Sequence, residues 1–345
     1  MSILMQLLQG GWDALLEYLS AHVLTCLVPA FFIAGAIAIF ISQGAVLRYF
    51  GPKAKKLLSY SVASVSGTIL AVCSCTVLPL FGGIYKRGAG IGPAVAFLYS
   101  GPAINVLAIV YSARILGYDL GAARAIGAIA FAAGIGIIMS LIYRKEESLK
   151  DSAVFDALLD NPEGKKWWQQ VIYFAVLVGI LIFAASKNWI VTGILLGVLG
   201  LLLWRWFTKG EIGMWMKETL RFVRLIVPWL LAGVFVAGII TTFVPQDAVT
   251  SWVGGNSLLA NFIASFAGAL MYFATLTEVP IIKAFMDLGM GKGPVLALLL
   301  AGPALSLPNM LVIRSIMGTK KTLTYIALVV IFATITGYIF GLITQ

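Results

Sequence analysis

The chain has 345 residues, of which 61% are hydrophobic and only 11% are charged, and the charged residues are spread over the whole length. A water-soluble protein of this length could not bury so much apolar surface, so the composition excludes a soluble globular domain and indicates a chain that folds in lipid. The net charge of +10 does not indicate nucleic-acid binding, because the Lys and Arg residues lie in short connections between apolar segments, as the positive-inside rule expects.

The first element is residues 1–21, in which apolar and acidic side chains would lie on different sides of a helix. The segment lacks the basic start and the small-residue cleavage site of a signal peptide. We therefore expect an amphipathic helix that lies on the membrane interface.

Ten apolar segments follow, each long enough to cross a hydrocarbon core of ~30 Å as a helix. They are residues 22–42, 58–82, 93–113, 120–143, 168–186, 188–207, 225–244, 257–280, 294–313 and 322–343. The polar stretches 144–167 and 205–224 are too short for a soluble domain and are interpreted as charged connectors. The sequence therefore predicts an all-α polytopic membrane protein.

Glycine and proline residues recur at an offset of 201 residues. The pairs include Gly67 with Gly268, Pro79 with Pro280, Gly88 with Gly289, Gly92-Pro93 with Gly293-Pro294, and Gly101-Pro102-Ala103 with Gly302-Pro303-Ala304. These residue types hold backbone geometry rather than generic hydrophobicity. The pattern predicts two copies of one unit, residues 22–143 and 221–343, separated by the cytoplasmic loop 144–167 and a helix pair at 168–207.

Loop charges predict how the two copies are oriented. If all ten segments crossed, the two sides would receive 14 and 10 of the 24 basic residues, a weak bias. If segments two and three make one net crossing, and eight and nine likewise, loops 43–57, 144–167, 205–224 and 314–321 share the cytoplasm with 17 basic residues. We expect about eight net crossings, extracytoplasmic termini and an inverted repeat, as in many secondary transporters. A ten-span bundle with parallel repeats is the open alternative.

The other seven basic residues are not in these four loops. Arg114, Arg124 and Lys187 fall on the opposite side in this scheme, and Lys86, Arg87, Lys283 and Lys292 are left unassigned at the hairpin tips.

Four prolines are expected to break helices near the middle of the bilayer. Each proline leaves the carbonyl four residues earlier without its helical donor, and the four are Pro79, Pro102, Pro280 and Pro303. Irregular backbone at membrane depth is tolerated only where protein or a water-filled cavity satisfies it. We therefore expect these positions to line a central pocket.

The Gly101-Pro102 and Gly302-Pro303 pairs are expected to open new helices, with proline at the first helical position and free amides directed toward the centre. A neutral polar or anionic ligand group could bind there. Three side chains on the following turns could add hydrogen bonds or could serve only as contacts between helices. They are Asn105, Ser306 and Asn309.

Residues 73–79 read Cys-Ser-Cys-Thr-Val-Leu-Pro. On a regular helix Cys73 and Cys75 point about 200° apart, so they converge on one ligand only if Pro79 unwinds the helix. A converged thiol pair would favour soft species such as Cu(I), Zn(II) or trivalent arsenic; the alternative is that the cysteines are small packing residues. The candidate binding residues are Cys73, Ser74, Cys75 and Thr76, with Cys73 and Cys75 as candidate metal ligands.

The equivalent segment of the second copy ends in Thr277-Glu278-Val-Pro280. It lacks the two thiols of the first copy and has a carboxylate two residues before the proline. An ionisable group inside a membrane is expensive and is a functional candidate by default. A low dielectric disfavours its charged form, which would suit a proton-coupled cycle with Glu278 as the coupling residue. Thr277 is a further candidate for substrate contact. The alternatives are that Glu278 reaches the interface or pairs with Lys283.

Two stretches carry a family signature. The first is Cys73-Ser-Cys-Thr-Val-Leu-Pro-Leu-Phe-Gly-Gly-Ile-Tyr-Lys-Arg-Gly-Ala-Gly-Ile-Gly-Pro93 with Tyr99-Ser-Gly-Pro-Ala-Ile-Asn105, and the second is Phe273-Ala-Thr-Leu-Thr-Glu-Val-Pro280 with Ala301-Gly-Pro-Ala304. Together they resemble the ArsP/YraQ-type family of bacterial permeases. The resemblance implies a permease with about eight crossings. Some members of that family export trivalent organoarsenicals, and others have been proposed to move copper or zinc.

The leading hypothesis is gradient-driven efflux of a small solute, in one version a thiophilic one, across a bacterial or archaeal inner membrane. The sequence contains no Walker motif. We expect no cofactor, no enzymatic activity and no nucleic-acid partner, and a homo-oligomer is left open. The alternatives are a membrane-embedded enzyme that uses Cys73 and Cys75, and a passive channel.

Overall fold

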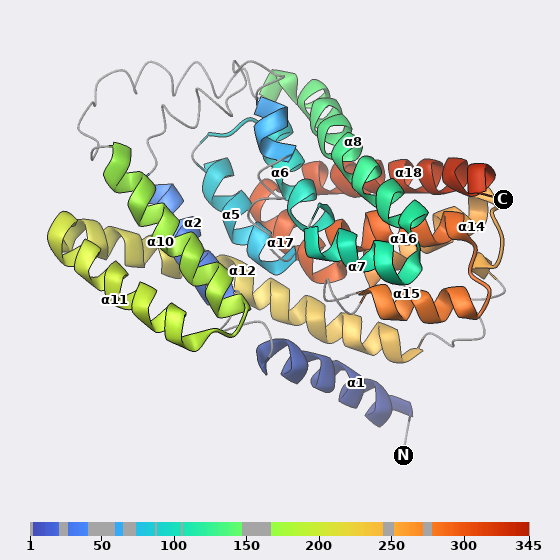
Figure 1. The fold of residues 1–345 in the computed structure, drawn as a ribbon, viewed down its shortest axis with the longest axis horizontal. Coiled ribbons are helices and arrows are strands. Elements are labelled where there is room, and N and C mark those ends of the chain that lie inside the picture. Colours follow the sequence, from blue (N-terminus) through green and yellow to red (C-terminus); the bar gives the residue numbers. More distant parts are fainter. Residues whose placement is uncertain are drawn as a thin grey trace.

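The computed structural model describes residues 3–20, 27–40, 59–64, 74–86, 88–104, 106–146, 167–243, 252–271 and 278–344, and its elements within these ranges are helices (Figure 1). The predicted all-α membrane fold is therefore confirmed. The helices are α1 (Ile3–Tyr18), α2 (Val28–Phe40), α5 (Ser74–Lys86), α6 (Ile91–Ala103), α7 (Val106–Leu116), α8 (Tyr118–Ile142), α10 (Trp167–Ala185), α11 (Trp189–Trp206), α12 (Lys209–Phe243), α14 (Leu258–Leu270), α15 (Glu278–Asp287), α16 (Lys292–Leu305), α17 (Leu307–Met317) and α18 (Thr319–Thr344).

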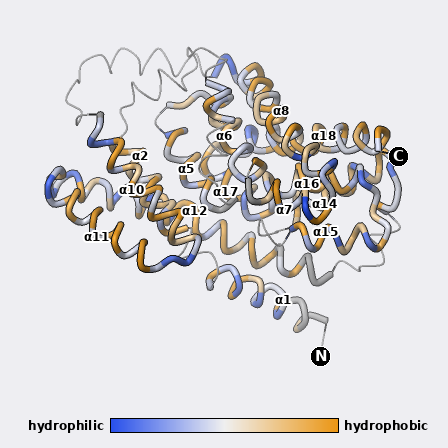
Figure 2. Tube along the Cα trace, viewed as in Figure 1, coloured by the Kyte–Doolittle hydropathy of each residue, from blue (hydrophilic) through white to orange (hydrophobic). Residues whose placement is uncertain are grey.

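Five helices in the described ranges are long and apolar enough to cross a membrane: α8, α10, α11, α12 and α18. The number rises to seven if the bent pairs α6–α7 and α16–α17 each form one span. Figure 2 shows hydrophobic residues along much of these helices. The outward surface of α11 is strongly apolar, since Ile190 is 79% exposed and Trp204 is 83% exposed. Such a surface suits contact with lipid rather than water. The count of about eight crossings stays a prediction.

Helix α12 corrects the prediction of a connector at residues 205–224. It begins at Lys209 and continues to Phe243 without interruption. A capping box starts it: the amide of Thr208 donates to the Glu211 carboxylate at 2.7 Å, and the amide of Glu211 donates to the Thr208 hydroxyl at 3.3 Å. The first half then packs on α2, where the Trp215 indole donates to the carbonyl of Phe32 at 2.8 Å. The charged stretch is therefore helical because it is capped and packed.

Helix α1 lies along the second half of α12 (Figure 1). The two helices approach closely at Gly238, where a Cβ would lie 2.7 Å from the carbonyl oxygen of Gly10. Trp12 on α1 is 56% exposed. The predicted helix is present, and its position at the membrane interface stays a prediction.

The two bent pairs correct the predicted position of the breaks. Helix α6 and helix α7 meet at 47°, and α16 and α17 meet at 46°. Pro102 and Pro303 lie inside the last turns of α6 and α16, so they do not open the following helices as expected. Pro308 instead occupies the first turn of α17, where the missing N–H has no helical partner to lose. The breaks therefore fall two to three residues after the Gly-Pro pairs.

The other two prolines also lie within helices. Pro79 is inside α5, which is helical from Ser74, so the expected unwinding is absent from residues 74–79. Pro280 is the third residue of α15, a first-turn position that a proline occupies without breaking a helix. Within the described residues neither Pro79 nor Pro280 interrupts a helix, and the convergence of Cys73 with Cys75 loses its predicted cause. Leu276, whose carbonyl Pro280 was predicted to leave without a donor, lies outside the described residues. Cys73 itself lies outside the described residues.

Corresponding elements of the two predicted copies have matching bounds. Adding 201 to α6, α7 and α8 gives the bounds of α16, α17 and α18 to within one residue at every end. Positive φ angles recur at the same offset, 94° at Gly88 with 105° at Gly289. These correspondences support the predicted repeat.

Contacts at the helix ends support opposite orientations for the two copies. Lys292 at the start of α16 pairs with Asp119 at the start of α8, at 2.7 Å. Lys321 at the start of α18 pairs with Glu146, just after α8, at 3.0 Å. Because the start of α16 also lies against the end of α18 near Gly337, α8 and α18 run in opposite directions.

Lys86 and Lys292, which the loop charges left unassigned, lie at opposite ends of the molecule. Lys86 at the end of α5 pairs with Glu218 on α12, and neighbouring Tyr85 accepts a hydrogen bond from Lys321. The tip of the first hairpin therefore lies on the side that carries Glu146 and Lys321. Lys292, at the tip of the second hairpin, lies at the opposite end of α8.

Candidate functional site

A buried ion pair joins α8 to α15. The Arg124 guanidinium Nη2 lies 3.1 Å from Oε2 of Glu278, and the two side chains are 0% and 1% exposed. Arg124 is the largest fully buried side chain in the described part of the chain. Charged groups are removed from solvent at a penalty of several kcal/mol each, so such a pair persists only where the fold or a function requires it.

This pair corrects two expectations. The scheme based on loop charges counted Arg124 among the outer basic residues, but it lies in the second turn of α8 and points into the protein. Glu278 was considered a partner of Lys283, but Lys283 pairs with Asp287 at 2.5 Å, one turn along α15. The signal for Arg124 was present in the sequence, because the residue falls inside the apolar segment 120–143. An arginine in such a segment is a functional candidate. Arg124 was not considered as a site residue because it was counted with the loop charges.

The surroundings of the pair come from two further elements. Nη1 of Arg124 donates to the hydroxyl of Ser112 on α7 at 2.9 Å, and that hydroxyl donates to the carbonyl of Ala108 at 2.7 Å. Gly302 on α16 lies against the carboxylate: a Cβ there would be 3.3 Å from Oε1 of Glu278. Gly302 therefore allows α16 to approach Glu278 just before the α16–α17 break.

Two tyrosines fix the end of α16 beside the pair. The hydroxyl of Tyr99 on α6 donates to the carbonyl of Leu300 at 3.0 Å, and that of Tyr325 on α18 lies 3.4 Å from the carbonyl of Ala304. Both rings are fully buried. Carbonyls in the last turn of a helix have no helical donors, so the Tyr325 hydroxyl supplies one at the break.

Several polar atoms around this region have no hydrogen-bond partner among the described residues. They are Nε of Arg124, Oε1 of Glu278, Oγ of Ser306 and Oδ1 of Asn309. A buried polar atom without a partner costs about 1–3 kcal/mol, and more for a charged group. Ser306 lies between α16 and α17, and Asn309 lies in the first turn of α17. The broken region of the second copy is therefore rich in polar groups that a ligand or water could satisfy.

The structure brings some of the predicted site residues together, and others lie outside the described residues. The structure brings Glu278 together with Gly302, and it buries Ser306 and Asn309 at the break next to Pro303. Thr76 is buried in α5. Cys73, Asn105 and Thr277 lie outside the described residues, and Ser74 and Cys75 are described only as backbone of α5. In the described ranges no group of three or more His, Cys, Asp or Glu side chains could hold a metal ion.

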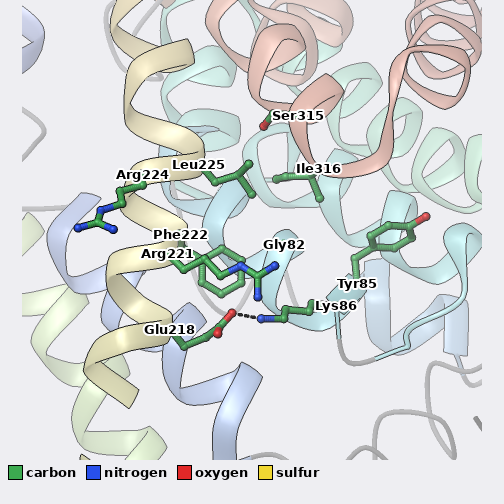
Figure 3. Close-up of a pocket in the computed structure, with 10 residues that line it drawn as sticks. All are labelled: Gly82, Tyr85, Lys86, Glu218, Arg221, Phe222, Arg224, Leu225, Ser315 and Ile316. Atoms are coloured by element: carbon green, nitrogen blue, oxygen red, sulfur yellow. Dashed lines mark hydrogen bonds and ion pairs between the residues drawn. The ribbon is translucent and has the colours of Figure 1, made fainter. Parts of the chain in front are cut away.

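An open pocket of about 690 Å³ lies between α5, α12 and α17 (Figure 3). Its lining includes Lys86, Glu218, Arg221 and Arg224. Figure 3 shows the Arg221 side chain directed toward the Lys86–Glu218 ion pair. The pocket lining carries a net positive charge. Ser315, also in the lining, is nine residues along α17 from the break, about 14 Å at the rise of a helix.

Comparisons with known proteins agree with a membrane transporter. The profile of a family described as predicted permease, ArsP_1, matches residues 10–342. The UPF0718 protein MJ0584 of Methanocaldococcus jannaschii is 46% identical over 365 residues and covers 100% of this chain and 99% of its own length. The UPF0718 protein YraQ of Escherichia coli is 24% identical and covers 97% of this chain and 83% of its own.

A third relative, from Streptococcus mutans, is provisionally named as a subunit of a two-component membrane permease complex. It is 24% identical and covers 88% of each chain. No solved structure matches the chain.

Proposed function

The chain belongs to the ArsP_1 family of predicted permeases, and from this premise we propose that it is a secondary-active permease for a small solute. The solute would pass through a central site between the two broken helix pairs, in the cytoplasmic membrane of a bacterium or archaeon. The observation that carries the proposal is the buried Arg124–Glu278 pair beside the α16–α17 break.

The pair supports coupling to a gradient because it can change its charge state inside the membrane. Protonation of Glu278 would neutralise the carboxylate and weaken its attraction to Arg124. Ionisable groups that face the interior of a membrane bundle commonly mark ion pathways and proton relays. The lack of a Walker motif in the sequence favours a gradient over ATP as the energy source.

The arrangement of the two halves supports alternating access. Equivalent helices α8 and α18 run in opposite directions, and each half contains one bent helix pair. Inverted repeats with discontinuous helices at the midplane are a common plan for secondary transporters. In this proposal the basic side of the molecule is cytoplasmic, and the pocket beside Lys86 and Arg221 is the cytoplasmic vestibule.

Efflux of a thiophilic solute is the finer form of the proposal. It depends on Cys73 and Cys75 near the start of α5, and the family resemblance to organoarsenical exporters motivates it. The Arg124–Glu278 pair does not choose between a thiophilic and a hard solute, so this form requires its own test.

The S. mutans relative, whose name describes a subunit of a complex, motivates a further proposal that this chain associates with a second membrane subunit or with a second copy. Differently tagged copies that co-purify after mild solubilisation would support a homo-oligomer. Recovery of a single tag would favour a monomer or a hetero-complex.

Flux out of proteoliposomes tests the proposal. Vesicles with the purified chain would be loaded with a panel of radiolabelled metals, arsenicals and anions, and efflux would be followed under an imposed pH gradient. We expect saturable flux that the gradient accelerates, and we expect Glu278→Gln to lose that acceleration while Lys283→Gln keeps it. Flux that required ATP would contradict a secondary carrier, flux that never saturated would indicate a channel, and turnover without transport would indicate an enzyme.

A further inference from the structure

We propose that the solute is an anion, that Arg124 binds it, and that Glu278 occupies the anion's place when the site is empty. The inference rests on the proposed permease function and names the chemical class of its substrate. Its basis is an arginine that is fully buried and that the described residues pair incompletely, next to a break in a helix.

The described residues leave donors of the guanidinium unused. Arginine carries five N–H donors, and its contacts with described residues use two of them, one to Ser112 and one to Glu278. The Nε donor has no partner among the described residues. A group with this many free donors in a low-dielectric interior is suited to a small oxyanion, which offers several acceptors at once.

The contact with Glu278 is weaker than an arginine–carboxylate pair can be. Such pairs are frequently bidentate, with two parallel N–H···O bonds. Here a single bond joins Nη2 to Oε2, and Oε1 is left beside Gly302 without a donor from the described residues. A pair that served only to hold helices together would gain from the second bond. The single bond is the arrangement expected of a carboxylate that can leave.

The charge balance defines the exchange. In the empty site one positive guanidinium faces one negative carboxylate, so the net charge is zero. When one proton adds to a carboxylate oxygen of Glu278 and one monovalent anion takes the freed donors of Arg124, the net charge is again zero. The membrane interior therefore never holds an uncompensated charge, and one proton accompanies each anion.

The other described groups near the pair do not supply a competing charge. Helix α7 presents the hydroxyl of Ser112, α16 presents Gly302, and the charged group that faces Glu278 is Arg124 of α8. The neighbouring titratable groups are the phenols of Tyr99 on α6 and Tyr325 on α18. Lys283 and Asp287, further along α15, pair with each other on the surface.

The vestibule has the charge that an anion needs. Lys86 is paired with Glu218, but the described residues provide no ion pair for Arg221, whose side chain points toward that pair between α5, α12 and α17 (Figure 3). Arg224 also lines the pocket, with its guanidinium directed away from the Lys86–Glu218 pair, and has no ion pair with a described residue. Clefts lined by one sign of charge raise the local concentration of the opposite ion. The same excess of positive charge would repel a soft metal cation from this vestibule.

Anion binding to the purified full chain in detergent tests the proposal. Three monovalent oxyanions, sodium nitrate, sodium formate and sodium acetate, would be titrated separately, with sodium gluconate to keep the ionic strength constant. We expect at least one probe to bind the wild type more tightly at pH 6 than at pH 8. If Glu278 excludes the anion from all but about a tenth of molecules at pH 8, Glu278→Gln should bind about tenfold tighter there and should lose the pH dependence.

The matched neutral pair Arg124→Gln with Glu278→Gln should not bind any of the probes. Lys283→Gln with Asp287→Asn removes an exposed pair from the same helix and should bind like the wild type. Binding by the Arg124→Gln, Glu278→Gln variant as tight as that of Glu278→Gln would overturn the proposal, and so would a lack of binding by all three probes to the wild type.

A measurement on the wild type alone keeps the test independent of whether the variants fold. In weakly buffered solution near pH 7, addition of the binding probe should raise the pH by an amount equivalent to up to one proton per bound anion. Binding without proton uptake would refute the exchange.

Gradient-driven flux of a cation or of a neutral arsenical without any anion binding would leave the permease proposal standing and reject this one. Anion binding with no flux of any kind would reject the permease and leave the Arg124 site.

Discussion

The hydroxyl of Tyr99 on α6 donates a hydrogen bond to the carbonyl of Leu300 on α16, and these two residues are separated by 201 positions, the offset that relates the two halves of the sequence. A contact between equivalent positions is expected where two copies of a unit meet at their mutual axis. Both partners are fully buried, so in the predicted repeat this hydrogen bond would belong to the interface between the copies.

Tyr99→Phe should weaken that interface without changing its shape. The substitution removes one hydroxyl and leaves the Leu300 carbonyl without this donor, so we expect a loss of about 1 kcal/mol in the free energy of unfolding. The measurement is thermal or denaturant unfolding in a defined detergent. Tyr118→Phe is the matched control, because Tyr118 is 79% exposed and should tolerate the change. Equal stability of the two variants would mean that the Tyr99 bond contributes nothing.

Arg124→Gln should be more harmful alone than together with Glu278→Gln. The single change leaves a buried carboxylate without its cation, and breaking such a pair costs about 3–5 kcal/mol. The double change leaves two neutral groups that can hydrogen bond, so much of the loss should be recovered. Unfolding of the four proteins in a double-mutant cycle gives the coupling energy. Additive losses would show that the two side chains do not interact.

The membrane fold could be predicted from the sequence because long apolar runs have few alternatives in lipid. Helix α18 spans Thr319–Thr344 where an apolar segment was expected at 322–343. The start of α12 was missed because the charges at 205–224 resemble a loop, although Thr208 and Glu211 form a capping box. Local capping outweighs composition there.

The site was predicted only in part. Glu278 and the polar residues after Gly302 were identified because ionisable and amide groups are rare at membrane depth. The partner of Glu278 could not be identified, since 154 residues separate it from Arg124 and only the packing of α8 on the second copy brings them together. The break positions were displaced because a proline in the last turn of a helix removes one hydrogen bond but does not end the helix, as Pro303 demonstrates.

Gly302→Ala should impair transport more than it impairs folding. The added methyl would lie 3.3 Å from Oε1 of Glu278, so the carboxylate or α16 would have to shift by a few tenths of an ångström. We expect slower flux in proteoliposomes with the protein still folded. Gly197→Ala on α11 is the control, because a Cβ there meets nothing within 4 Å. Flux of the Gly302 variant equal to that of the control would indicate that Glu278 does not need this close approach.

Cys73→Ser together with Cys75→Ser tests the thiophilic form of the function. If the thiols bind the solute, an efflux-deficient host that expresses the variant should lose protection against trivalent arsenicals. Cys26→Ser is the control, since Cys26 lies in a different apolar segment. Undiminished resistance of the double variant would reduce the two thiols to packing residues and would favour the anion site at Arg124.

Single cysteines at Lys86 and Asp287 should be labelled from opposite sides of the membrane. These positions are equivalent at the offset of 201, they end α5 and α15, and their side chains are 40% and 62% exposed. In a cysteine-free background, an impermeant maleimide should reach Asp287→Cys in intact cells, and Lys86→Cys only after the cells are opened. An inverted repeat predicts this result, because Lys86 pairs with Glu218 on the basic side, whereas Lys292 pairs with Asp119 at the other end of α8. Labelling of both cysteines from one side would require parallel copies, and the symmetry on which alternating access depends would be absent.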